Sequence, residues 1–167
     1  MLHEGVKKYT IGEYKIDVDP YYHEQMVKTV YEINNNEAKS DKNFANILGP
    51  TELSSKMVWT QTEVFNSLLE LILAYGKHHF KNHNLTICNC WALIYKPLHY
   101  SIQHDHKTTA GAFCFYLNDC DTPINFEGLS IKPKKDTLVL LPPYVEHSVP
   151  PHQGIHDRLV LAGNYKF

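Results

Sequence analysis

The feature that most constrains the fold is the density of short strand-like runs in the second half of the chain. Apolar and β-branched runs, each bounded by turn residues, recur from residue 86 to the end. Strands this short and closely spaced indicate a barrel or a sandwich. The expected strands are 86–95, 101–106, 110–118, 124–131, 136–141, 145–149 and 158–165.

The first half, residues 1–85, is expected to supply mainly helical cover for this core. Asp19-Pro20 predicts a helix start, because Asp is a good N-cap and Pro fits the first helical position. Thr60 and Glu63 form a capping box ahead of apolar residues at helical spacing. The second predicted helix runs to about residue 80 and buries its apolar stripe on the sheet.

Length and composition bound the class of protein. A chain of 167 residues predicts one α+β domain, 1–167, in which residues 86–167 form the core that carries the site. The net charge of −2 and the lack of a basic stripe disfavour a nucleic-acid partner. The start MLHEGVKKYT does not resemble a signal peptide, and no apolar run is long enough for a bilayer. We therefore expect a cytoplasmic protein with no membrane contact and four reduced cysteines; the sequence indicates no oligomeric state.

His104-Asp105-His106 lies in one of the predicted strands. Residues two apart on a strand point to the same face, so His104 and His106 can share one metal ion while Asp105 points away. Asp105 becomes the second ligand only if the strand contains a bulge. A single H-x-H pair in a chain with 11 histidines is a weak signal without further ligands.

A third histidine follows the Pro142-Pro143 turn. His147 shares a strand face with Val145 and Val149, so its ring is expected to point into the core. Together with the H-x-H pair it predicts a metal site of three imidazoles with open positions. Such a site suits iron, and zinc or nickel less specifically.

Arg158 is the only arginine in the chain, and it opens the last predicted strand. It shares a face with Val160, Ala162 and Asn164, which indicates that the side chain points inward. A buried guanidinium without a partner is very costly. Its partner is therefore either a distant Asp or Glu or the carboxylate of a bound ligand.

Taken in order, these elements resemble the iron(II)- and 2-oxoglutarate-dependent oxygenases, and most closely the compact prolyl-hydroxylase-like members of bacteria and phages. The resemblance rests on the H-x-H pair, the segment GAFCFYLN (111–118), the segment EHSVP (146–150) and the strand that begins with Arg and reaches Asn164. It covers about residues 88–165. It implies a double-stranded β-helix, or jelly-roll, core.

The same resemblance implies the cofactors and the roles of particular residues. Iron, Fe(II), would be held by His104, His106 and His147, and dioxygen (O2) would be the co-reactant. Arg158 and Tyr116 would hold the distal carboxylate of 2-oxoglutarate, and Tyr95 would line the same pocket. Asn164 and Trp91 are expected on the substrate side, although Trp91 can equally pack in the core. The implied reaction is hydroxylation of peptidyl proline or of a small molecule.

Two departures from the family pattern keep alternatives open. The second ligand position is His106 where the usual motif has Asp, and Val160 stands where many relatives have Ser. A three-histidine cupin-type dioxygenase is one alternative, although that pattern wants a Glu where residues 109–111 stand. A metal-binding protein that has lost the chemistry is the other. Fold alone does not choose between these, because function depends on the site.

Overall fold

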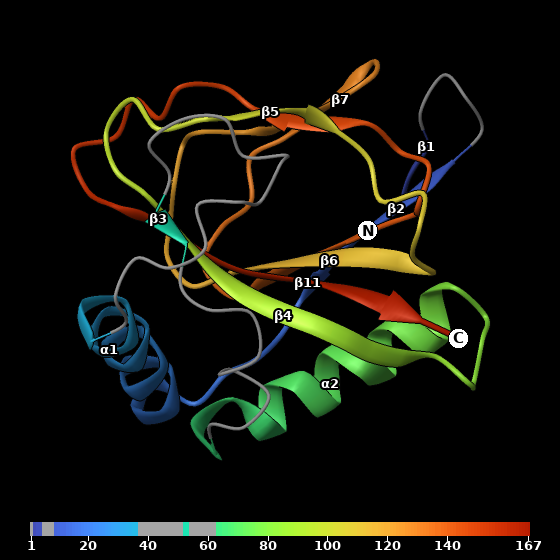
Figure 1. Cartoon of the computed structure of the whole chain (residues 1–167), viewed down its shortest axis with the longest axis horizontal. Helices are drawn as coiled ribbons and strands as arrows, with labels where there is room; N and C mark the ends of the chain where they lie inside the picture. Colours follow the sequence, from blue (N-terminus) through green and yellow to red (C-terminus); the bar gives the residue numbers. More distant parts are fainter. Residues whose placement is uncertain (1, 5–8, 37–51, 54–62) are drawn as a thin grey trace.

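The computed structural model describes residues 2–4, 9–36, 52–53 and 63–167. Two antiparallel sheets lie one above the other, and two helices lie below the larger sheet (Figure 1). In chain order the elements are β1 (Leu2–Glu4), β2 (Thr10–Lys15), α1 (Pro20–Asn36), β3 (Glu52–Leu53), α2 (Glu63–His79), β4 (Thr86–Tyr95), β5 (Ser101–His104), β6 (Gly111–Tyr116), β7 (Ile124–Phe126), β8 (Leu129–Ile131), β9 (Thr137–Leu141), β10 (His147–Val149) and β11 (Arg158–Lys166).

The larger sheet has the strand order β1-β2-β9-β6-β11-β4-β3, and the smaller sheet has the order β5-β10-β7-β8. β11 lies between β6 and β4 and is buried along almost its whole length, from Arg158 to Tyr165. Both faces of such a strand are covered, by the small sheet on one side and by the helices on the other. The space between the two sheets is therefore the interior in which a site can form.

The first helix begins where the sequence predicts. The Asp19 carboxylate accepts hydrogen bonds from the backbone N–H groups of Tyr21 and Tyr22, so Asp19 is the N-cap of α1. α2 begins, among the described residues, at Glu63, whereas Thr60 of the predicted capping box lies outside them. Gly76 lets α2 approach the large sheet, because a Cβ there would lie 2.7 Å from the ring of Tyr165.

Three expectations about the strands need correction. β1, β2 and β3 were not predicted; β2 joins the large sheet beside β9, a pairing set by contacts distant in sequence. The single strand expected at 124–131 is two strands, β7 and β8, because Gly128 takes a φ of 75° and reverses the chain. The strand expected at 101–106 ends at His104, so His106 lies beyond it.

All four cysteines are free. Of the two helices in the described ranges, neither is long and apolar enough to cross a membrane.

Candidate metal centre

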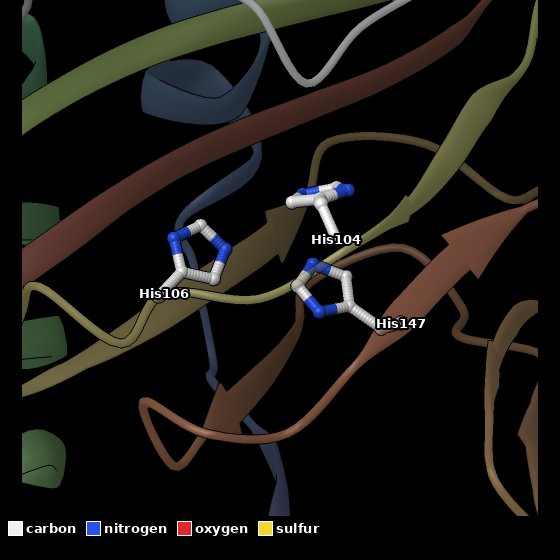
Figure 2. A group of neighbouring side chains, drawn as sticks. All are labelled: His104, His106 and His147. Atoms are coloured by element: carbon white, nitrogen blue, oxygen red, sulfur yellow. The ribbon is translucent and has the colours of Figure 1, made fainter.

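Three histidine rings converge between the sheets, as Figure 2 shows. One ligand atom from each of His104, His106 and His147 lies within 4.8 Å of the others. The ring centroids of His104 and His147 are 4.3 Å apart, and that of His106 is 5.4 Å from the first and 5.1 Å from the second. A cluster this tight allows three nitrogens to reach one ion.

The small sheet and one turn bring these rings together. His104 ends β5 and His147 begins β10, and the two residues are direct partners in the antiparallel register. His106 lies outside the strand, so period-two alternation is not the reason for its position. Its backbone N–H donates to the carbonyl of Pro143 (2.8 Å), which ties the segment after β5 to the turn before β10. The Pro142-Pro143 turn therefore positions two of the three histidines: it precedes His147 and it binds the backbone of His106.

Burial keeps the three rings neutral at physiological pH. It lowers the pKa of His104, and it lowers the pKa of His106 to about 4 with a further contribution from the His104 ring. Burial and the two neighbouring rings lower the pKa of His147 to about 3. A neutral imidazole keeps a lone pair on one nitrogen, which is the form that binds metal. This donor set fits a divalent transition metal ion such as Fe(II).

The alternative ligand, Asp105, is directed elsewhere. Its carboxylate forms an ion pair with Lys107 (2.5 Å) and accepts from the backbone N–H of that residue. The hydrogen bond from the Lys107 ammonium holds the pKa of Asp105 below its usual range. The geometry thus favours His106 over Asp105 as the third metal ligand.

Arg158 lies in the same interior, at the start of β11 and opposite Tyr95. The side chain is 2% exposed, and among the described residues no carboxylate forms an ion pair with it. Nη2 donates to the hydroxyl of Tyr116 (3.3 Å), and the guanidinium carbon lies 4.6 Å from the ring centroid of Tyr95 and 5.1 Å from that of Tyr116. Nε has no hydrogen-bond partner. A buried cation with an unused donor is what an anionic ligand would complete.

The surrounding side chains are neutral. The hydroxyl of Tyr95 shares a 2.6 Å hydrogen bond with Ser101, and burial raises the pKa of both Tyr95 and Tyr116. Burial likewise raises the pKa of the Cys114 thiol to about 11. One cavity of about 40 Å³ is lined by the three histidines together with Arg158, Tyr95, Tyr116 and Trp91. No acidic residue in the described part of the chain lines this cavity.

Sequence reasoning missed two polar residues of this cavity, Cys114 and Ser101, and placed Asn164 in it. Cys114 precedes Tyr116 by two positions on β6, so alternation alone could have indicated it. Ser101 meets Tyr95 only because of the turn between β4 and β5, for which the sequence has no signal. Two further histidines, His99 and His152, are buried outside this cavity. Asn164 is not among the residues that line the cavity; its Nδ2 donates to Asn89 (2.9 Å).

No protein-family profile and no curated protein matches this sequence. Solved structures do match. A viral collagen prolyl hydroxylase from Paramecium bursaria Chlorella virus-1, in complex with 2-oxoglutarate, is 10% identical, with a TM-score of 0.70 over 93% of this chain and 94% of that one. A Pseudomonas putida prolyl-4-hydroxylase is 13% identical, with a TM-score of 0.72 over 93% and 91%. SnoK, a non-heme α-ketoglutarate-dependent carbocyclase of nogalamycin biosynthesis, is 10% identical, with a TM-score of 0.77 over 93% and 78%.

These neighbours are Fe(II)/2-oxoglutarate-dependent oxygenases, and prolyl hydroxylases are among them. The chain shares their fold over nearly its whole length. The resemblance that the sequence motifs indicate is therefore confirmed at the level of the fold. At identities of 13% or less, the activity is a separate question that depends on the site.

Proposed function

We propose that this protein is an Fe(II)- and 2-oxoglutarate-dependent dioxygenase that hydroxylates a peptidyl proline or a small molecule. One observation carries the proposal: three neutral imidazoles and a buried arginine without a carboxylate partner line one cavity. The imidazoles suit a divalent metal, and the arginine suits an anion at a fixed place beside it. 2-Oxoglutarate offers both a metal-binding end and a distal carboxylate.

Each residue has a defined task in this proposal. His104, His106 and His147 hold Fe(II), which, when bound with 2-oxoglutarate and O2, supplies the oxidising power for C–H hydroxylation. Arg158 and the hydroxyl of Tyr116 bind the distal carboxylate. The proton of Tyr116 stays on its oxygen, since burial raises the pKa of that phenol, so the group acts as a donor.

The remaining lining orients the ligand and excludes water. Tyr95 is held by Ser101 and packs its ring against the guanidinium of Arg158, which limits where that cation can move. Trp91 covers another wall of the cavity and is proposed on the substrate side. The cavity of about 40 Å³ is smaller than a five-carbon diacid, so side chains must move apart on binding.

We further propose that the two facing sheets form a double-stranded β-helix and that the whole chain acts as one domain. In this organisation residues 86–167 carry the site, and the helices stabilise the large sheet from its outer side. The substrate class is supported by the prolyl hydroxylases and the small-molecule enzyme SnoK among the proteins of the same fold.

A second function is favoured by a specific observation. The ligand set contains three histidines and, within the described ranges, no carboxylate. That set is also typical of three-histidine metal dioxygenases that do not use 2-oxoglutarate. In such a protein Arg158 would bind the substrate's own carboxylate, or the metal would be bound without turnover.

The test is thermal unfolding of metal-stripped protein with Mn(II), with 2-oxoglutarate, and with both. Saturation at a hundred times Kd stabilises by about 2.7 kcal/mol, which corresponds to roughly 5–10 °C for a chain of this size. We expect 2-oxoglutarate to raise the melting temperature only when the metal is present. Glutarate, which lacks the 2-oxo group, is the matched control and should have little effect. A metal shift with 2-oxoglutarate silent would support the second function.

A further inference from the structure

Two hydroxyl groups share a single hydrogen bond in the wall of the metal-site cavity. The phenol oxygen of Tyr95 and Oγ of Ser101 are 2.6 Å apart, and both residues are buried and line the cavity. Each hydroxyl carries one proton, and only one of the two protons can lie between the oxygens. The other proton points elsewhere, and among the described residues neither hydroxyl donates to a second acceptor.

The surroundings of Tyr95 indicate which hydroxyl keeps the unused proton. Tyr95 lies opposite Arg158 in the register of β4 and β11, and the guanidinium carbon is 4.6 Å from its ring centroid. A guanidinium only donates, so it favours a phenol oxygen that turns a lone pair toward the cation and its proton away. Tyr95 therefore donates to Ser101, and the proton of Ser101 is the one that remains available.

The cavity around this pair is rich in donors and poor in acceptors. Nε of Arg158 has no hydrogen-bond partner, and the hydroxyl of Tyr116 accepts from Nη2 of that arginine, so its own proton is directed away from it. The next row of the large sheet, Leu93 and Val160, is apolar. In the described part of the chain no negatively charged side chain lines the cavity. Several donors thus face a space in which the protein supplies no anion.

Ser101 reaches this space from the small sheet, which faces the large sheet that carries Arg158. It begins β5 and pairs with Val149 of β10. Apart from histidines, it is the only polar side chain that the small sheet contributes to the lining, within the described ranges. An anion between the sheets would therefore meet Arg158 on one side and the Ser101 hydroxyl on the other.

We propose that the Ser101 hydroxyl donates a hydrogen bond to the distal carboxylate of 2-oxoglutarate, beside Arg158 and Tyr116. Tyr95 sets the direction of that hydroxyl by donating to its oxygen. A carboxylate has about four lone-pair sites, which is enough to accept from all of these donors. This role rests on the proposed function and adds a binding residue to it, because the sequence motifs assign no part to Ser101.

The experiment is calorimetric titration of the full chain with 2-oxoglutarate at saturating Mn(II). Ser101→Ala removes a hydrogen bond to a charged group, so the Kd for 2-oxoglutarate should rise about 10- to 150-fold. Tyr95→Phe keeps the ring beside Arg158 and leaves Ser101 its proton, so the Kd should rise by no more than about fivefold. The Kd for Mn(II), titrated separately, should stay unchanged in both variants.

Ser130→Ala is the matched control. Ser130 is also a serine of the small sheet with a hydrogen-bonded hydroxyl, which donates to Asn125 (2.7 Å), but it lies outside the cavity. Its loss should leave the Kd for 2-oxoglutarate and the Kd for Mn(II) unchanged.

A double-mutant cycle separates direct binding from a structural role. If Ser101 donates to the ligand, Ser101→Ala should weaken 2-oxoglutarate binding by a similar factor in a Tyr95→Phe background. If Ser101 only holds the Tyr95 hydroxyl, the second substitution should cost no further affinity. The double variant also removes both members of the hydrogen bond, so no buried hydroxyl is left without its partner.

The outcomes are distinct. Wild-type affinity in Ser101→Ala, no additional loss in the Tyr95→Phe background, or a larger loss in Tyr95→Phe than in Ser101→Ala would overturn the role of Ser101 and leave the proposed function standing. A wild-type protein that does not bind 2-oxoglutarate with Mn(II) would overturn the proposed function and this role with it. If Ser101→Ala does not fold by circular dichroism, the comparison of the double variant with Tyr95→Phe decides.

Discussion

Replacing Arg158 by methionine should stabilise the ligand-free protein while it abolishes binding of 2-oxoglutarate. The guanidinium is 2% exposed and donates one hydrogen bond, to Tyr116 at 3.3 Å, while Nε is unpartnered. Within the described ranges it has no ion pair. The rings of Tyr95 and Tyr116 offset part of the cost of burying the charge, but they carry no negative charge.

The magnitude follows from these contacts. Burying an ion costs several kcal/mol after relaxation, and a single hydrogen bond with two ring contacts recovers only part of that. Apolar replacement of buried charges is often stabilising by about 1–4 kcal/mol. We expect a gain of about 1–3 kcal/mol in the free energy of unfolding for Arg158→Met. For a chain of this size that raises the melting temperature by roughly 2–12 °C.

With ligands bound, the wild-type protein should become more stable than Arg158→Met. Mn(II) with 2-oxoglutarate at a hundred times Kd adds about 2.7 kcal/mol to the wild-type protein. The Arg158→Met protein should gain only the part due to the metal, because losing one partner of a buried charge pair costs about 2–5 kcal/mol of binding energy. That loss corresponds to a Kd roughly 30- to 5,000-fold higher.

The assay is urea unfolding and calorimetry of both proteins, metal-free and with both ligands, at pH 7. Arg158→Lys is the matched control: it keeps the buried charge but loses the planar fork, so it should gain no stability and still bind poorly. A methionine variant that folds but is less stable than wild type without ligands would refute the reasoning. It would mean that Arg158 is already satisfied inside the protein.

Three further predictions concern the same site. Asp105→Asn should leave Mn(II) affinity by calorimetry unchanged, whereas His106→Asn should lower it at least about tenfold; the opposite order would make Asp105 the ligand. Acid should destabilise the metal-free protein, because the pKa of His147 is lowered to about 3 in the folded state. Below pH 6.5 the unfolded chain binds a proton at this histidine that the folded protein does not bind, so the free energy of unfolding falls. Between pH 7 and 5, His147 alone should account for a loss of about 2 kcal/mol in urea unfolding, and His106, whose pKa is lowered to about 4, should add a similar loss. The total loss should be smaller in His147→Gln, and an unchanged stability would contradict buried neutral rings. Tyr116→Phe should raise the Kd for 2-oxoglutarate about tenfold or more without changing that for Mn(II); a loss of Mn(II) binding would place Tyr116 at the metal instead.

Local patterns were sufficient for the elements with strong signals. β4 occupies the range that its apolar run predicts, and α1 begins at the Asp19-Pro20 signal. β2 was missed because its pairing with β9 depends on residues more than a hundred positions away. The end of β5 at His104 was also missed, since strand ends depend on hydrogen bonds to partner strands.

The sequence by itself determined which residue types could form a site. An H-x-H pair, a histidine between inward valines and a single arginine at a strand start are all visible in the order of the residues. Tertiary structure alone decided that His147 lies opposite His104, that the Pro142-Pro143 turn holds His106, and that Arg158 meets two tyrosines and, among the described residues, no carboxylate. The physical reason is range: periodicity reports on neighbours within a few residues, whereas a metal site and the partner of a buried charge depend on sheet register between distant strands.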